Sequence, residues 1–348
     1  MAEDELNQFP EDYFQYDKAN LLEQYSKVGA DIKSAYLLGD DVELFDIQTV
    51  DKIFFLGMGG SAISSEFARM LLNHLGSKIP VFSVKDYNIP STMTENSLVF
   101  AVSYSGNTEE TLSAFKEAQR ITRKCVGLAS GGRLEELFTF NRLPFIKVPK
   151  GYQPRTAAIS YLFFPILRIL ERLGIIPTQQ ASVQELVKGI VKPDFKTYSI
   201  NISEKLFGTI PIIYASDKYY PVAYRFKSEI NENAKIHAFS HSYSEFNHNE
   251  ILGYTRLESE KYHIVTFHFD DDHRRIHKRM ELVKDLTNKA GVETTEIKLT
   301  GTDFLTKVFT AILIGDLSAY YLALRYKTDP SPVEIIENLK KNLGTPVL

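Results

Sequence analysis

Short β-rich runs alternate with helical segments along most of this chain, and no other sequence feature constrains its fold as strongly. In the first half, segments of helical character at 62–76, 107–122 and 133–138 separate the runs KIFFLGM, IPVFSVK, SLVFAVSYS, KCVGLAS and PFIKVPK. Strands that alternate with helices form βαβ units, in which parallel strands make one sheet with helices on both faces. A long helix at about 156–173 is expected to close this half.

The second half repeats this rhythm without a glycine-rich loop. GTIPIIYAS predicts a strand, PVAYRFKSEINENAK a helix and IHAFSHS a strand, and a long helix is expected at 303–325. We therefore expect two doubly wound parallel-sheet α/β domains of flavodoxin-like, three-layer type, at 51–175 and 195–326. A helical N-terminal segment at 1–50 and a C-terminal helical tail at 327–348 would flank them.

Composition narrows the class of protein. A chain of 348 residues that is 44% hydrophobic and 24% charged is typical of a soluble protein with two domains. The net charge of -4 gives no reason to expect a nucleic-acid partner. The acidic N-terminus does not read as a signal peptide, and apolar runs such as YLFFPILRIL are too short to span a membrane. With Cys125 as its single cysteine, the chain fits a reducing compartment, and we expect it in the cytoplasm.

A glycine-rich turn follows the first predicted strand. GMGGSA, at residues 57–62, fits G-x-G-x-x-A, in which backbone N–H groups and a helix N-terminus meet a pyrophosphate. The acidic residue expected about twenty positions further on is displaced, because the second strand ends later, at Lys85 and Asp86. This loop alone leaves three interpretations open: a dinucleotide site, a site for another anion, and a tight turn without a ligand.

A second polar loop follows the third strand. In VSYSGNTEET, the hydroxyls of Ser103, Ser105, Thr108 and Thr111 gather where a strand passes into a helix. Asn107 and Glu110 could form a simple helix cap, but a cap does not need so many hydroxyls. Because neighbouring parallel strands end at one crevice, both loops would surround one compact dianion there.

Together, GMGGSA and SYSGNTEET resemble the sugar isomerase (SIS) domain, which binds phosphorylated sugars. The resemblance implies that five residues bind the substrate phosphate: Gly60, Ser61, Ser103, Ser105 and Thr108.

Further segments extend the resemblance over nearly the whole chain. QPRTA, NENAK, FNHNE and the ending DPSPV…I…LK, in this order, resemble the bifunctional phosphoglucose/phosphomannose isomerases of archaea and some bacteria. This resemblance implies an aldose–ketose isomerase that interconverts glucose 6-phosphate, and mannose 6-phosphate, with fructose 6-phosphate. It also implies a homodimer that needs no metal or other cofactor.

The same resemblance assigns the chemistry to four residues. Glu232 would move a proton between C1 and C2. His248, which related isomerases contribute from the partner subunit, and Lys340 would open the sugar ring. Arg155 would stabilise the enediolate.

Several alternatives stay open from sequence. Glu229 lies on nearly the same helix face as Glu232, and Lys341 competes with Lys340. Ser331 lies in a region thought to shape mannose acceptance in this family, where a threonine would be more usual. The rival function is a non-catalytic, sugar-phosphate-sensing SIS protein, which would not need the catalytic set.

One further stretch could suggest other chemistry. HFDDDHRRIHKR combines His268, His273 and His277 with residues 270–272, which could suggest a metal site. A polar loop that leads into a solvated basic helix is the favoured interpretation, and we expect no metal there.

Overall fold

The computed structural model describes residues 9–45, 49–190, 193–256 and 258–343. Parts of the expected N-terminal segment (1–8, 46–48) and of the tail (344–348) lie outside them. The chain divides into two compact units. We call Lys27–Val187, with the helix that begins at Glu334, the first-sheet unit. The segment up to Ser26, with Lys188–Val333, is the second-sheet unit.

The first-sheet unit contains a parallel sheet in the order β2-β1-β3-β4-β5. Its strands are β1 (Lys52–Leu56), β2 (Val81–Val84), β3 (Ser97–Val102), β4 (Cys125–Ala129) and β5 (Phe145–Lys147). The chain adds β2 on one side of β1 and β3 on the other, so the strand order reverses between β1 and β3. This is the flavodoxin-like order, whose ligands bind beyond the carboxyl ends of the strands at that reversal.

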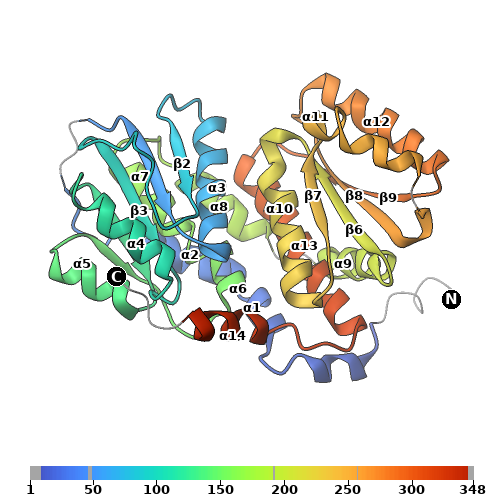
Figure 1. Cartoon of the computed structure of the whole chain (residues 1–348), viewed down its shortest axis with the longest axis horizontal. Coiled ribbons are helices and arrows are strands. Elements are labelled where there is room, and N and C mark those ends of the chain that lie inside the picture. The colour runs from blue at the N-terminus through green and yellow to red at the C-terminus, as the bar shows by residue number, and fades with distance from the viewer. Residues whose placement is uncertain (1–8, 46–48, 191–192, 257, 344–348) are drawn as a thin grey trace. The chain divides into compact units, whose positions relative to one another are not determined.

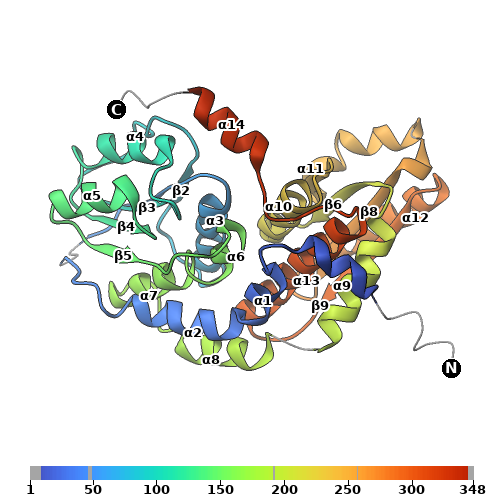
Figure 2. The ribbon, with the colours of Figure 1, turned by 90° about the horizontal axis from the view of Figure 1, so that it is seen from below.

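Helices cover both faces of this sheet (Figure 2). They are α2 (Val28–Leu38), α3 (Gly59–His74), α4 (Glu109–Ala118), α5 (Gly132–Phe140), α6 (Pro154–Ile159) and α7 (Phe164–Arg172), and α14 (Glu334–Leu343) belongs to the same unit. Alternate strand residues such as Phe54 and Val99 pack with Phe115 of α4 and Phe138 of α5. This alternation follows from the period of two in a strand, which sends successive side chains to opposite faces.

The prediction of a single long helix at about 156–173 is wrong. The structure has two helices there, α6 and α7, and α7 carries Pro165 in its first turn. Proline has no N–H to donate to the preceding turn, so a helix restarts at such a residue more readily than it continues through it.

The second-sheet unit contains a parallel sheet in the order β7-β6-β8-β9. Its strands are β6 (Ile210–Ala215), β7 (Phe239–Ser242), β8 (Tyr262–Phe269) and β9 (Glu293–Leu299). Figure 1 shows α10 and α13 on one face of this sheet and α11 and α12 on the other. The doubly wound fold expected from sequence is confirmed for both sheets.

The remaining elements are all helices, and the label η marks short helices that are not α-helical. They are η1 (Glu11–Tyr16), α1 (Leu21–Ser26), α8 (Gln180–Gly189), α9 (Pro193–Leu206), η2 (Asp217–Tyr219), α10 (Tyr220–Glu229), η3 (Ile230–Ala234), α11 (Tyr243–Phe246), η4 (Glu250–Thr255), η5 (Ser259–Lys261), α12 (Arg274–Lys289) and α13 (Phe304–Arg325). Among the described residues, α13 alone has the length and hydropathy of a membrane span. However, 94% of its most apolar window is buried inside the protein, as in a core helix.

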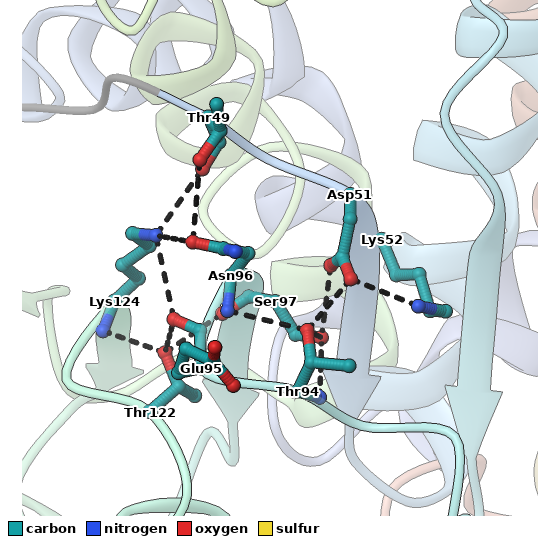
Figure 3. Close-up of polar contacts among 9 residues, drawn as sticks. All are labelled: Thr49, Asp51, Lys52, Thr94, Glu95, Asn96, Ser97, Thr122 and Lys124. Atoms are coloured by element: carbon teal, nitrogen blue, oxygen red, sulfur yellow. Dashed lines mark hydrogen bonds and ion pairs between the residues drawn. The ribbon is translucent and has the colours of Figure 1, made fainter.

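A polar network holds the amino ends of the first sheet's strands (Figure 3). Asp51 accepts hydrogen bonds from Thr94 Oγ1 at 2.6 Å, Ser97 Oγ at 3.2 Å and Lys52 Nζ at 2.9 Å. Partial burial raises the pKa of Asp51, but these donors outweigh it and hold the pKa below its usual range. The network lies at the opposite edge from the carboxyl ends of the strands and is a stabilising feature.

Candidate active site

The glycine-rich loop joins β1 directly to α3. Gly60 has no room for a side chain, because an added Cβ would lie 2.9 Å from the carbonyl oxygen of Pro154. Ser61 is buried, and its amide bonds back to the carbonyl of Met58 at 3.0 Å. The Ala62 amide bonds to the same carbonyl at 3.2 Å, so this loop passes directly into the first turn of α3. The positive end of a helix dipole lies at such a start and suits an anion.

The serine- and threonine-rich loop joins β3 to α4. Ser103 and Thr108 share a hydrogen bond of 2.9 Å between their hydroxyls, and the N–H of Gly106 donates to Ser103 Oγ at 3.1 Å. Thr108 stands at the N-cap position of α4, and Ser105 is exposed. The hydroxyls are therefore held by local bonds at a helix start.

These two loops meet at the β1/β3 reversal. The N–H of Tyr104 donates to Ser61 Oγ at 3.2 Å and so ties the second loop to the first. The structure thus brings together the five residues expected to surround a phosphate: Gly60, Ser61, Ser103, Ser105 and Thr108. Hydroxyls and helix starts that meet at one point can bind a compact dianion.

Arg155 lies beside this point. It is the second residue of α6, whose first residue, Pro154, lies against Gly60. Arg155 is 4% exposed, so it is almost wholly buried. The sequence places Arg155 nearly a hundred residues after Gly60, and the contact arises from the fold alone.

Glu232 lies in a π-helical turn, η3, that continues α10 in the second-sheet unit. Wide π turns are rare and often mark functional sites, since the inserted residue reorients the side chains around it. Glu232 is half-buried, and Lys235 donates a hydrogen bond to its backbone carbonyl. Lys235 also bonds to the carbonyl of Pro330 at 3.2 Å, so the turn is attached to the segment that carries Ser331.

A buried cluster of charged residues, formed by Arg225, Glu229 and Asp316, holds this π turn in place. Arg225 bonds Asp316 of α13 at 2.6 Å and contacts Glu229 at 3.3 Å, with all three side chains at most 3% exposed. Asn233 donates to the other oxygen of Glu229 at 3.1 Å. Glu229 is thus committed to this cluster, which argues against it as a substitute for Glu232. Sequence reasoning missed the cluster, because nothing local links Arg225 to a residue 91 positions away.

His248 and Glu232 lie at opposite ends of β7. Glu232 precedes this strand, whereas His248 follows it, just after α11. Four strand residues span about 13 Å, and Figure 1 shows the C-terminal end of α10 and α11 at opposite edges of the sheet. His248 is exposed. The two residues of one chain therefore do not converge within this unit.

Lys340 lies on α14, none of whose residues is buried. This helix carries an exposed apolar stripe of Ile335, Ile336, Leu339 and Leu343. By the 3.6-residue period, Lys340 borders that stripe, whereas Lys341 lies on the opposite side. If α14 packs against another surface through this apolar stripe, Lys340 would lie at the edge of that contact and Lys341 would remain in solvent.

The corresponding crevice of the second sheet, between β6 and β8, already holds a carboxylate. Asp271 accepts from Lys218 Nζ at 2.6 Å, Lys307 Nζ at 2.8 Å and Tyr219 Oη at 2.8 Å. Partial burial raises the pKa of Asp271, but these donors outweigh it and hold the pKa well below its usual range. An internal anion therefore occupies the donors that could have met a phosphate here.

The side chains of the histidine- and aspartate-rich stretch bond mainly to one another and to nearby backbone. His277 Nδ1 and His268 Nε2 share a hydrogen bond of 3.1 Å, and His273 caps α12 by accepting from the N–H of Arg275. In the described part of the chain, no three His, Cys, Asp or Glu residues are arranged to hold a metal ion.

Comparison with known proteins defines the class and then the family. A model of the SIS domain matches residues 46–132, and a model described as the bacterial phospho-glucose isomerase C-terminal SIS domain matches residues 195–343. The chain is 36% identical over 329 residues to a bifunctional phosphoglucose/phosphomannose isomerase of Caldicellulosiruptor bescii, covering 90% of this chain and 96% of that one. The chain is thus an SIS-domain protein. It belongs to the bifunctional phosphoglucose/phosphomannose isomerase family, which confirms the resemblance.

Two other comparisons mark the range of this similarity. A D-glucosamine-6-phosphate 4-epimerase of Sulfolobus acidocaldarius is 37% identical over 220 residues, 62% of this chain and 68% of that one. Among solved structures, the C-terminal domain of the glucosamine-fructose-6-phosphate aminotransferase of Francisella tularensis superposes with a TM-score of 0.70 at 15% identity. That superposition covers 90% of this chain and 98% of the other, and shows a shared fold.

Proposed function

We propose that this protein is an aldose–ketose isomerase that interconverts glucose 6-phosphate, and mannose 6-phosphate, with fructose 6-phosphate. The observation that carries the proposal is the meeting of the glycine-rich and hydroxyl-rich loops at the β1/β3 reversal. They offer a site for one phosphate, in a chain whose family membership is established over most of its length. We expect the enzyme in the cytoplasm.

In this proposal, the substrate phosphate binds at Ser61, Ser103, Ser105 and Thr108, with the N–H groups around Gly60. A phosphate far from the reacting carbons lets binding energy hold C1 and C2 in a reactive geometry. Arg155 stabilises the negative charge that develops on the enediolate oxygen.

Proton transfers follow ring opening. His248 and Lys340 assist the opening, and Glu232 then takes the proton from C2 and returns it to C1. The fixed π turn supports this role for Glu232, because a base must be held within hydrogen-bond reach of the proton. Lys340 is preferred over Lys341 for its place beside the apolar stripe of α14.

We propose a homodimer in which His248 acts on the partner subunit's substrate. The separation of Glu232 and His248 along β7 supports this arrangement. Two groups that act on one small sugar but lie at opposite edges of one sheet are most simply supplied by two copies.

The test is an assay of the purified protein with glucose 6-phosphate and mannose 6-phosphate, each with EDTA present. We expect both to yield fructose 6-phosphate. Glu232→Gln should lower kcat by about 10²- to 10⁴-fold while sugar-phosphate binding persists. Glu281→Gln, on the exposed face of α12, is the matched control and should keep wild-type turnover.

The rival functions give distinct results. Binding of sugar phosphates without turnover by the wild type would indicate a sensor. D-glucosamine 6-phosphate, assayed in parallel, tests the 4-epimerase chemistry of the Sulfolobus relative. Wild-type turnover by Glu232→Gln would refute Glu232 as the base.

A further inference from the structure

Tyr104 lies between Ser103 and Ser105, and its backbone connects three loops at the carboxyl edge of the first sheet. Its N–H donates to Ser61 Oγ at 3.2 Å. Its carbonyl accepts from the N–H of Ser130 at 2.8 Å and from the Ser130 hydroxyl at 2.7 Å. The backbone of Tyr104 is therefore part of the proposed phosphate site.

The side chain of Tyr104 serves a different contact. It is 9% exposed, and its hydroxyl donates to the carbonyl of Pro149 at 3.0 Å and accepts from the N–H of Tyr152 at 2.9 Å. A phenol is protonated at neutral pH in any case, and burial raises the pKa of Tyr104 further, so its hydroxyl can donate. One hydroxyl thus holds both sides of the turn at Lys150 and Gly151.

That turn begins the segment that ends in Arg155. Its other attachments are also specific: Tyr152 and Tyr161 both donate to Asp31 Oδ1, at 2.7 and 3.0 Å. Asp31 is a buried residue of α2. The segment 149–155 is therefore held by the Tyr104 hydroxyl at its start and by Asp31 through Tyr152 in its middle.

We propose that Tyr104 is a positioning residue whose hydroxyl sets the place of Arg155 relative to the phosphate loops. This inference rests on the proposed function, in which Arg155 stabilises the enediolate. A displacement of about 1 Å in such a group can cost up to about 10²-fold in rate. Loss of the hydroxyl should therefore weaken binding of the transition state and leave binding of the phosphate largely intact.

Tyr104→Phe tests this positioning role. The substitution removes the hydroxyl but keeps the aromatic ring and the hydrogen bonds made by the backbone of residue 104. We expect kcat to fall about 10-fold with KM within about twofold of wild type. Tyr36→Phe is the matched control. It also loses a tyrosine hydrogen bond in the same unit, at 2.6 Å to Glu171, but its bonding partners Glu171 and Arg168 lie on α7, outside the segment 149–155. Tyr36→Phe should leave both kcat and KM unchanged, even if it lowers the thermal stability as much as Tyr104→Phe does.

Two inhibitors separate positioning from general damage. Arabinonate 5-phosphate carries a carboxylate that mimics the enediolate, whereas sorbitol 6-phosphate keeps the phosphate without that charge. In Tyr104→Phe, the Ki of the aldonate should rise about 10-fold and that of sorbitol 6-phosphate by less than about twofold. Tyr152→Phe, which releases the segment from Asp31, should give the same split and serves if Tyr104→Phe does not fold.

Equal weakening of both inhibitors, or no change in either, would overturn the positioning role. Failure of the proposed function looks different, since the wild type would then show no isomerisation and no preference for the aldonate.

Discussion

At the scale of single residues, the proposed phosphate site depends on the absence of side chains as much as on hydroxyls. Gly106 has a φ of +69° in the loop between Ser103 and Thr108. A Cβ there would lie 1.8 Å from the carbonyl oxygen of Gly131, a separation no side chain tolerates. The hydroxyl loop can therefore keep this shape only with glycine at position 106.

We predict that Gly106→Ala raises the KM for sugar phosphates by about 10-fold or more, because the backbone must shift to relieve the clash. Gly174→Ala is the control: it has the same φ of +69°, but an added Cβ meets nothing within 4 Å. It should cost about 1 kcal/mol of stability and leave KM unchanged. Steady-state kinetics and thermal unfolding of both variants test this prediction. Equal KM values for Gly106→Ala and Gly174→Ala would show that the clash does not shape the site.

At the scale of elements, the buried cluster of Arg225, Glu229 and Asp316 holds the π turn in place. Arg225 of α10 and Asp316 of α13 are both almost inaccessible to solvent. A buried pair contributes little net stability by itself, but removing one partner leaves the other charge uncompensated. This cluster is therefore sensitive to single changes.

Asp316→Asn should destabilise the protein by about 3 kcal/mol, because Arg225 would lose the closer of its two buried carboxylate partners and keep only Glu229, at 3.3 Å. Asp303→Asn, the same change at the N-cap of the same helix, should cost less than about 0.5 kcal/mol, since asparagine caps helices as well as aspartate does. Denaturant unfolding measures both. A small loss for Asp316→Asn would mean that the buried charge is relieved by another route.

At the scale of the whole molecule, the proposed homodimer would build each active site from two copies of the chain. Glu232→Gln and His248→Ala are each expected to be inactive as homodimers. In a hybrid dimer, one of the two sites would receive neither change.

We predict that mixing the two variants under conditions that exchange subunits restores activity to about a quarter of the wild-type value, since half the dimers are hybrids with one intact site each. Activity is measured before and after exchange, with each variant alone as its control. Absence of recovery, in samples shown by mass spectrometry to contain hybrids, would place His248 and Glu232 in the same subunit's site. Wild-type activity of His248→Ala by itself would remove His248 from the chemistry.

Much of this protein was predictable from local sequence. The alternation of strands and helices, with the two loops after β1 and β3, gave the doubly wound fold and the meeting point of Ser61 and Ser103, because parallel strands end at one edge. The error at 156–173 arose where Pro165 restarts a helix inside a continuous apolar run.

Other features followed only from tertiary structure. The pairing of Arg225 with Asp316, the commitment of Glu229, the π geometry around Glu232 and the link from Tyr104 to the Arg155 segment leave no periodic or motif signal. Each depends on side chains from distant positions that the packing of helices on a sheet brings into contact. The sequence by itself determined which residue types stand at the strand ends. Tertiary packing decided which of them are held in place, because a long-range contact is fixed by the shape of the whole core and not by its neighbours in the chain.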